Sequence, residues 1–300
     1  MRILVTGARG KVGRATVTAL QAAGHEVVAS DLARPTYERA DEGAAPYIQA
    51  DLTDPGACFA LVRRCDAVVH TAAIPEPTQN VPHEVFGNNL MSLFNLIEAC
   101  VRMDVKRLVN LSSETVPGLV FPERPFDPQY FPIDEEHPVR PQDPYALAKL
   151  FGEQLCTAAT QRSDIRCITI RPTWVQDETN YARNLGPQIR AAAAGTPEPT
   201  VNGWSYIDVY DLAEAIRLAC ESDLPGHEVF YISSPEAPGV ADTAAALAAQ
   251  YGDRVELRHF QRVDGCGTST EKARRLLGWT PTRSYRDYLT DDGQARTDPA

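Results

Sequence analysis

The sequence predicts an α/β protein, a doubly wound parallel sheet with helices on both faces and a small carboxyl-terminal lobe. Two observations predict this class. Over the first half of the chain, short valine-rich apolar segments alternate with segments whose apolar residues recur at helical spacing. A glycine-rich turn over residues 7–13 separates the first such strand from the first helix. A chain of 300 residues suffices for one large domain with an added lobe.

The predicted strands are short and apolar on both faces, which is typical of strands buried inside a parallel sheet. We expect strands at residues 3–5, 26–30, 67–70, 107–111, 166–170 and 229–233. A further strand should precede Asp51, and residues 204–209 predict a short strand or turn. Helices between such strands imply right-handed crossovers.

The helical segments carry apolar residues three and four positions apart. We expect helices at residues 12–23, 56–64, 85–103, 145–162, 211–221, 241–250 and 270–277. Residues 117–144 contain eight prolines, which exclude a regular helix or a central strand. A disordered linker is one interpretation of this segment. Because it also carries aromatic anchors, among them Phe126 and Phe131, we expect an ordered loop packed over the domain.

Composition excludes several classes of function. The net charge of −11 argues against nucleic acid as a partner and against a polybasic membrane anchor. The seven cysteines never form a Cys-x-x-Cys pair and the six histidines are scattered singly, so no metal site is predicted. The sequence opens directly on a strand and lacks an apolar run long enough for a membrane span. We therefore expect a soluble, cytoplasmic protein.

The glycine-rich turn has the spacing G-x-x-G-x-x-G. Glycine allows the backbone to turn sharply and to approach a pyrophosphate without a Cβ in the way. The amino terminus of the following helix offers unpaired N–H groups to the phosphates. The predicted dinucleotide-binding residues of this turn are Gly7, Arg9, Gly10, Lys11, Val12 and Gly13.

Asp31 supplies the second sign of a dinucleotide site. It ends the second predicted strand, 18 residues after Gly13, where a carboxylate accepts hydrogen bonds from both ribose hydroxyls of NAD and repels a 2′-phosphate. The alternative is an ordinary surface or helix-capping aspartate. Arg9 and Arg34 lie close in the sequence, so NADP remains possible beside NAD. Asp51 and Leu52, after the next strand, are expected to bracket the adenine.

Tyr145 and Lys149 form the candidate catalytic pair. They lie four residues apart on one face of a predicted helix. A free tyrosine has a pKa of about 10, and a nearby ammonium and an oxidised nicotinamide both favour the phenolate. Tyr145 would then take the proton of a substrate hydroxyl. Ser112 and Ser113 end a strand in the crevice where such sheets bind ligands, and are expected to hydrogen-bond the substrate oxygen, although serine pairs also end strands for structural reasons alone.

The order and spacing of these motifs, with His70-Thr-Ala-Ala73 and Arg171-Pro172, resemble the extended branch of the short-chain dehydrogenase/reductase superfamily, the NAD-dependent epimerase/dehydratase-like enzymes. The resemblance implies a Rossmann-type fold and makes Ser113, Tyr145 and Lys149 the catalytic residues. It also implies that the cofactor is contacted by Tyr145 and Lys149 and by further residues of the motifs: Thr71, Ala72, Ala73, Asn89 and Pro172. The two long helices at 85–103 and 145–162 match those that form a dimer-wide bundle in many relatives, so a homodimer is expected.

Departures from the family pattern bear on the substrate. Nucleotide-sugar epimerases usually carry a diphosphate-binding arginine where this chain has Trp204, and an aromatic ring cannot replace that clamp. Alternatively, Trp204 belongs to the core, and Arg183 or Arg190 binds the phosphates. Asn180 and Tyr181 are the other candidates for substrate contact.

The sequence therefore predicts an NAD(P)-dependent oxidoreductase acting on a secondary alcohol or ketone of a sugar, sugar acid or secondary metabolite. A nucleotide-sugar epimerase with tightly bound NAD and a non-catalytic dinucleotide-binding module are the alternatives. Residues 1–172 are predicted to form the NAD-binding domain with the catalytic residues, residues 173–290 a smaller, interleaved substrate-binding lobe, and residues 291–300 a frayed polar tail.

Overall fold

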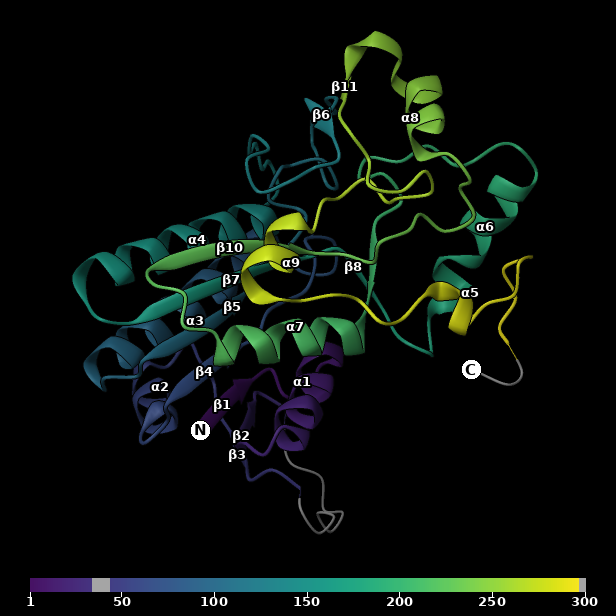
Figure 1. Ribbon diagram of the computed structural model, residues 1–300. Helices are drawn as coiled ribbons and strands as arrows, with labels where there is room; N and C mark the ends of the chain where they lie inside the picture. The colour runs from purple at the N-terminus through teal and green to yellow at the C-terminus, as the bar shows by residue number, and fades with distance from the viewer. Residues whose placement is uncertain (34–43, 297–300) are drawn as a thin grey trace.

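A seven-stranded parallel sheet forms the centre of the molecule in the computed structural model, which describes residues 1–33 and 44–296 (Figure 1). The strand order is β10-β7-β5-β4-β1-β2-β3. The strands are β1 (Arg2–Thr6), β2 (Glu26–Asp31), β3 (Tyr47–Gln49), β4 (Ala67–His70), β5 (Arg107–Leu111), β7 (Arg166–Pro172) and β10 (His227–Ile232). Strands β2 and β3 follow β1 on one side, whereas β4, β5, β7 and β10 extend the sheet on the other side of β1. A ligand-binding crevice is therefore expected beyond the carboxyl ends of β1 and β4.

Helices cover both faces of this sheet, which confirms the predicted fold class. On one face lie α1 (Lys11–Ala22), α7 (Val209–Glu221) and α9 (Glu271–Leu277); on the other lie α2 (Pro55–Val62), α3 (Pro82–Arg102) and α4 (Pro144–Arg162). Side chains of β1 point alternately to the two faces of the sheet, so Ile3 and Val5 pack in the core on one face and Leu4 in the core on the other. All three are fully buried.

A smaller outer region lies beyond the carboxyl ends of the strands, where Figure 1 shows α8, β6 and β11 standing away from the sheet. Its own core includes Phe131, Trp204 and Leu247. Its elements are β6 (Tyr130–Phe131), β8 (Trp174–Gln176), α5 (Tyr181–Asn184), α6 (Gly186–Ala193), β9 (Tyr206–Asp208), α8 (Thr243–Tyr251), η1 (Gly252–Arg254), β11 (Glu256–Leu257) and η2 (Tyr285–Asp287). The proline-rich segment 117–144 contributes β6, so the prediction of an ordered loop is confirmed.

Residues after 172 do not all belong to this outer region. The helix α7 covers the main sheet, and β10 pairs with β7 in parallel register, Phe230 beside Ile170. The predicted fraying of the tail is wrong for residues 291–296. There the chain folds back, and the Arg296 amide donates to Tyr288 O at 2.8 Å. Residues 297–300 lie outside the described part.

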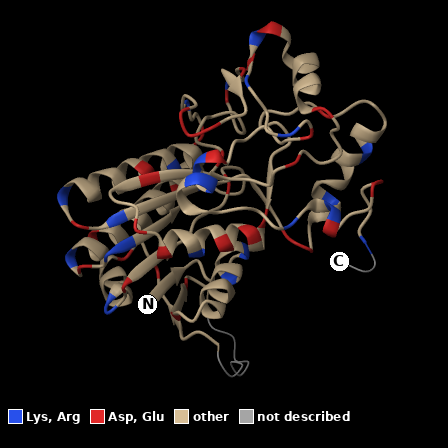
Figure 2. Ribbon diagram, in the orientation of Figure 1, with Lys and Arg blue, Asp and Glu red and all other residues tan. Residues whose placement is uncertain are grey.

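Over the described ranges, no helix is long and apolar enough to cross a membrane, and no group of metal-ligating side chains gathers. The seven cysteines are free and buried. Basic and acidic residues are interspersed along the described elements (Figure 2). The cytoplasmic location stays a prediction.

Candidate active site

Two adjoining cavities lie at the carboxyl ends of the central strands. The larger measures about 850 Å³ and extends from the glycine-rich turn past the end of β5 and the start of α4 to residues 199–202. The smaller measures about 520 Å³ and is lined by the ends of β1 and β2 and by residues 50–52 and 71–74. Both contain Gly7, Gly10 and Thr71, so the glycine turn joins them.

The glycine turn leaves the amino terminus of α1 open toward the larger cavity. Gly10 is the N-cap, with no side chain bonded there and no acidic residue in the first turn. Two glycines are also required by packing, because a Cβ on Gly7 would lie 2.6 Å from Ala72 N and one on Gly13 would lie 2.0 Å from Gly7 O. The free N–H groups and the close approach of backbone suit a diphosphate.

Asp31 lies in the smaller cavity with its carboxylate fixed by the backbone. Oδ2 accepts the Arg9 N–H at 2.9 Å, and Oδ1 accepts the Ala33 N–H at 3.1 Å. Asp51 and Leu52 line the same cavity. This donor and acceptor set fits the adenosine half of NAD, with the carboxylate available to ribose hydroxyls. Arg34, which left NADP possible, lies outside the described residues.

Asn89 does not line either cavity, although the family resemblance placed it near the active site. Its side chain is used within the protein: Oδ1 accepts the Ile74 N–H at 2.7 Å and Nδ2 donates to Ile74 O at 2.9 Å. It therefore fixes the segment after β4. That segment carries Thr71 and Ala73, which line both cavities, and Ala72, which lines the smaller one.

Ser113, Tyr145 and Lys149 meet in the larger cavity, where each is almost fully buried. Asp143 starts α4 by accepting the N–H groups of Tyr145 and Ala146, both at 2.9 Å, and this cap places the tyrosine in the first turn. Ser113 Oγ accepts the Thr115 N–H at 3.1 Å, and the Ser113 side chain lies close enough to the Tyr145 phenol to lower its pKa. Lys149 Nζ donates to Leu111 O at 2.6 Å and lies 5.5 Å from the centre of the tyrosine ring.

Burial dominates the acidity of this pair. It raises the pKa of Tyr145 to about 12, against the opposing hydrogen bond from Ser113. It also lowers the pKa of Lys149 to about 8, against the opposing charge of Glu153. The tyrosine is thus a protonated acid in the protein alone. Ionising it requires the further positive charge that the expectation assigned to oxidised nicotinamide.

The two serines after β5 have different surroundings. Ser112 Oγ donates to Glu153 Oε1 at 2.6 Å, on the buried side of α4. Arg171 closes the network, with Nε and Nη2 donating to the two oxygens of Glu153 at 2.9 and 2.7 Å. The hydroxyl of Ser112 is therefore occupied within the protein, whereas that of Ser113 meets the catalytic tyrosine.

Three residues predicted to touch substrate lie away from the cavity lining. Tyr181 is buried and its hydroxyl donates to Asp208 at 2.9 Å, and Asn180 Oδ1 accepts the Asp177 N–H at 2.9 Å. Trp204 packs in the outer core, where its indole donates to Glu198 O at 3.1 Å. The structure thus agrees with the core alternative for the tryptophan.

The arginines proposed as replacements for a phosphate clamp also lie outside the lining. Arg190 donates to Gly293 O at 3.3 Å, and Arg183 donates to Asn184 at 3.3 Å.

Sequence reasoning overlooked Glu114 and Asn202 as cavity residues. Asn202 Nδ2 donates to Glu114 Oε2 at 2.9 Å, and burial raises the pKa of that carboxyl to about 8. The position of Glu114 directly after the serine pair was a usable signal. Asn202 comes from an irregular segment 88 residues away, for which the sequence offers no periodicity.

Comparisons with known proteins agree with this geometry. Residues 3–232 match the family described as "NAD dependent epimerase/dehydratase family". UDP-glucose 4-epimerase of Bacillus subtilis is 29% identical, over 97% of this chain and 95% of that protein. A short-chain dehydrogenase/reductase superfamily protein from Agrobacterium tumefaciens with bound NAD superposes with a TM-score of 0.70 at 26% identity, covering 95% and 94% of the two chains. MoeE5, in complex with UDP-glucuronic acid and NAD, gives 0.69 at 26% identity and 95% coverage of each chain.

Proposed function

Because the chain belongs to the NAD dependent epimerase/dehydratase family, we propose that it is an NAD-dependent oxidoreductase interconverting a secondary alcohol and a ketone. The family confirms the resemblance drawn from the motifs, and with it NAD as the cofactor. Bound NAD supplies a hydride acceptor or donor. We assign the matching proton to the Tyr145 phenol, and the hydrogen bond that steadies the substrate oxygen to Ser113.

The charged residues of the cavity lining are the basis for the substrate class that we propose. Among the described residues, the lining includes no arginine, and its cations are Lys11 in the glycine turn and Lys149 beside the tyrosine. Glu76 and Glu114 add carboxyl groups to the same lining. The amino terminus of α1 can hold the diphosphate of NAD, but a second diphosphate, on the substrate, would need arginine forks or further cations. We therefore propose a substrate without phosphate or carboxylate, such as a neutral sugar or a hydroxylated secondary metabolite.

A nucleotide-sugar epimerase is the second candidate, and the names of the relatives favour it. In such a reaction the hydride leaves the substrate and returns to it, and the cofactor stays bound. Mass spectrometry of the dinucleotide that survives purification and gel filtration separates the two proposals when combined with substrate assays. Net NADH formation with an unphosphorylated alcohol supports the oxidoreductase. Retained NAD with interconversion of UDP-glucose and UDP-galactose, and no net NADH, supports the epimerase.

We further propose that the protein is a homodimer through α3 and α4. Met91 and Phe94 on α3 and Phe151 on α4 leave large apolar side chains exposed, and Phe86 and Phe151 are in edge contact at 6.0 Å. A second copy would cover this face. Light scattering should give twice the monomer mass for the natural chain and the monomer mass for Phe94→Asp. A monomeric natural chain contradicts the proposal.

A further inference from the structure

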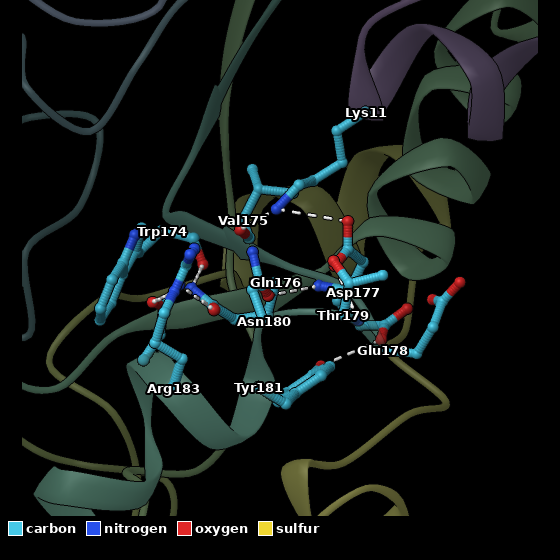
Figure 3. Close-up of polar contacts among 12 residues, drawn as sticks. Lys11, Trp174, Val175, Gln176, Asp177, Glu178, Thr179, Asn180, Tyr181 and Arg183 are labelled. Carbon is cyan, nitrogen blue, oxygen red and sulfur yellow. Dashed lines mark hydrogen bonds and ion pairs between the residues drawn. The ribbon is translucent and has the colours of Figure 1, made fainter.

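Lys11 forms an ion pair with Asp177, the residue after β8 (Figure 3). It is the first residue of α1 and lines the cavity with the glycines. Its Nζ lies 3.4 Å from Asp177 Oδ2 and donates to Val175 O at 3.4 Å. Val175 belongs to β8 and lines the cavity on the wall that follows Pro172. A single side chain thus reaches from the diphosphate-binding turn to the segment that follows β8.

Hydrogen bonds within its own loop orient the Asp177 carboxylate for this contact. Oδ1 accepts the Thr179 N–H at 3.0 Å and the Thr179 hydroxyl at 2.6 Å, while the Asp177 N–H donates to Asn180. Burial alone would raise the pKa of Asp177, but the bonds from Thr179 and the charge of Lys11 outweigh it and lower the pKa. The carboxylate is therefore ionised and oriented. The side chains are 33% exposed for Lys11 and 15% for Asp177.

We propose that the ion pair of Lys11 and Asp177 forms a bridge beside the NAD site, tying the glycine turn to the segment that carries Val175, and that this bridge slows release of the dinucleotide. The diphosphate is expected at the amino terminus of α1, beside Lys11. A dinucleotide held there lies next to the turn that the bridge joins to the segment of Val175, which lines the same cavity. The bridge contributes to how long NAD stays on the protein, and hence to whether the cofactor exchanges between turnovers. The inference requires only NAD binding and is independent of the substrate.

A different role for Lys11 predicts the opposite sign for one substitution. If Lys11 only neutralised the diphosphate, Asp177 would compete with the phosphates for the ammonium, and removing its charge would slow NADH release. If the bridge retains the dinucleotide, removing the same charge speeds release. Asp177→Asn is the informative variant, because asparagine keeps an oxygen that accepts from Thr179 and so preserves the loop.

The test is stopped-flow fluorescence of NADH dissociation from the full-length chain, comparing Lys11→Met, Asp177→Asn and the double variant. Loss of one partly exposed ion pair corresponds to about a two- to fivefold change in the dissociation rate. Each single variant should therefore release NADH at least about twofold faster than the natural chain. The double variant should release it no faster than Lys11→Met alone, because both changes break one contact. Release that is unchanged or slower in Asp177→Asn overturns the proposal, as does an effect in the double variant equal to the product of the two singles.

The ion pair between Lys272 and Glu228 provides the matched control. Its atoms are 2.8 Å apart, its side chains are 25% and 33% exposed, and it joins α9 to β10 away from the cavity lining. Lys272→Met should leave NADH release unchanged. An acceleration equal to that of Asp177→Asn would mean that loss of any such pair loosens the site, and would overturn the bridge. Because no substrate enters the assay, failure here is distinguishable from failure of the proposed oxidoreductase activity.

Discussion

Glu153→Gln should destabilise the protein and shift the alkaline limb of its pH–rate profile to lower pH. Glu153 accepts three hydrogen bonds, one from Ser112 and two from Arg171, at 2.6 to 2.9 Å. The Glu153 and Arg171 side chains are only 7% and 6% exposed. Glutamine keeps an oxygen for Ser112 but leaves the guanidinium without its counter-ion.

The expected loss follows from this burial. Removing one partner of a buried ion pair costs about 3–5 kcal/mol, because the other charge stays desolvated and unpaired. At about 2 °C for each kcal/mol in a chain of this size, the melting temperature should fall by roughly 6–10 °C. The catalytic lysine responds as well, since Glu153 opposes the burial that brings the pKa of Lys149 to about 8. Without that charge the pKa falls further.

The sign of the pH effect is set by the ammonium form of Lys149. The ammonium is present below its pKa and is lost as the pH rises through it, at about 8 in the natural chain. In Glu153→Gln the same loss occurs at lower pH. Denaturant unfolding followed by circular dichroism measures the stability, and kcat/KM against pH measures the limb. The reasoning is refuted by a stability loss under about 1 kcal/mol or by an unmoved alkaline limb.

A compensating variant separates charge from shape. In the double variant Glu153→Gln with Arg171→Met, no unpaired cation remains in the core, and Ser112 keeps an acceptor. Because replacing both partners of a buried pair is often nearly neutral, the double variant should recover more than half of the lost stability. A double variant as unstable as the sum of two damaging singles would contradict the unpaired charge as the cause.

Three further predictions concern the cavities. Asp31→Ala should weaken NAD binding roughly tenfold or more, because hydrogen bonds to a charged group are lost. The variant should also discriminate less between NAD and NADP. Fluorescence titration with NADH and NADPH measures both effects, and equal affinities in the variant and the natural chain would count against the ribose role of Asp31. Gly13→Ala should abolish NADH binding, because its Cβ would lie 2.0 Å from Gly7 O; retained fluorescence enhancement would contradict that packing. Above about pH 8, where the Glu114 carboxyl is ionised, Glu114→Gln should raise kcat/KM for a uronic acid relative to that for the parent sugar. An unchanged ratio in that pH range would remove Glu114 from the proposed charge selection.

The sequence was sufficient where local pattern determines structure. β4 and β5 begin and end at the predicted residues because their apolar runs lie between polar turns. The glycine turn and Asp31 were placed correctly because a strand, a tight turn and a helix follow one another in the chain. Tyr145 and Lys149 share a helix face, so their proximity also follows from local geometry.

The remainder depended on contacts between distant segments. Trp204 has a φ of +56° and lies in a core with Phe131, which no periodicity of its own segment indicates. Asn202 reaches Glu114 through tertiary folding alone. The burial of Tyr145 was also beyond the sequence, since spacing reveals the neighbouring lysine but not the burial that raises the pKa of the tyrosine in the protein alone.

Proton transfer by Tyr145 is tested most directly by NADH formation in Tyr145→Phe, with an alcohol that the natural chain oxidises and with NADH binding measured in parallel. We expect turnover to fall by about 10²–10⁴-fold, the usual contribution of a positioned acid or base, while NADH affinity stays within about threefold. Tyr210→Phe, a change on the exposed face of α7, should leave both unchanged. Turnover in Tyr145→Phe close to that of the natural chain would contradict the assignment.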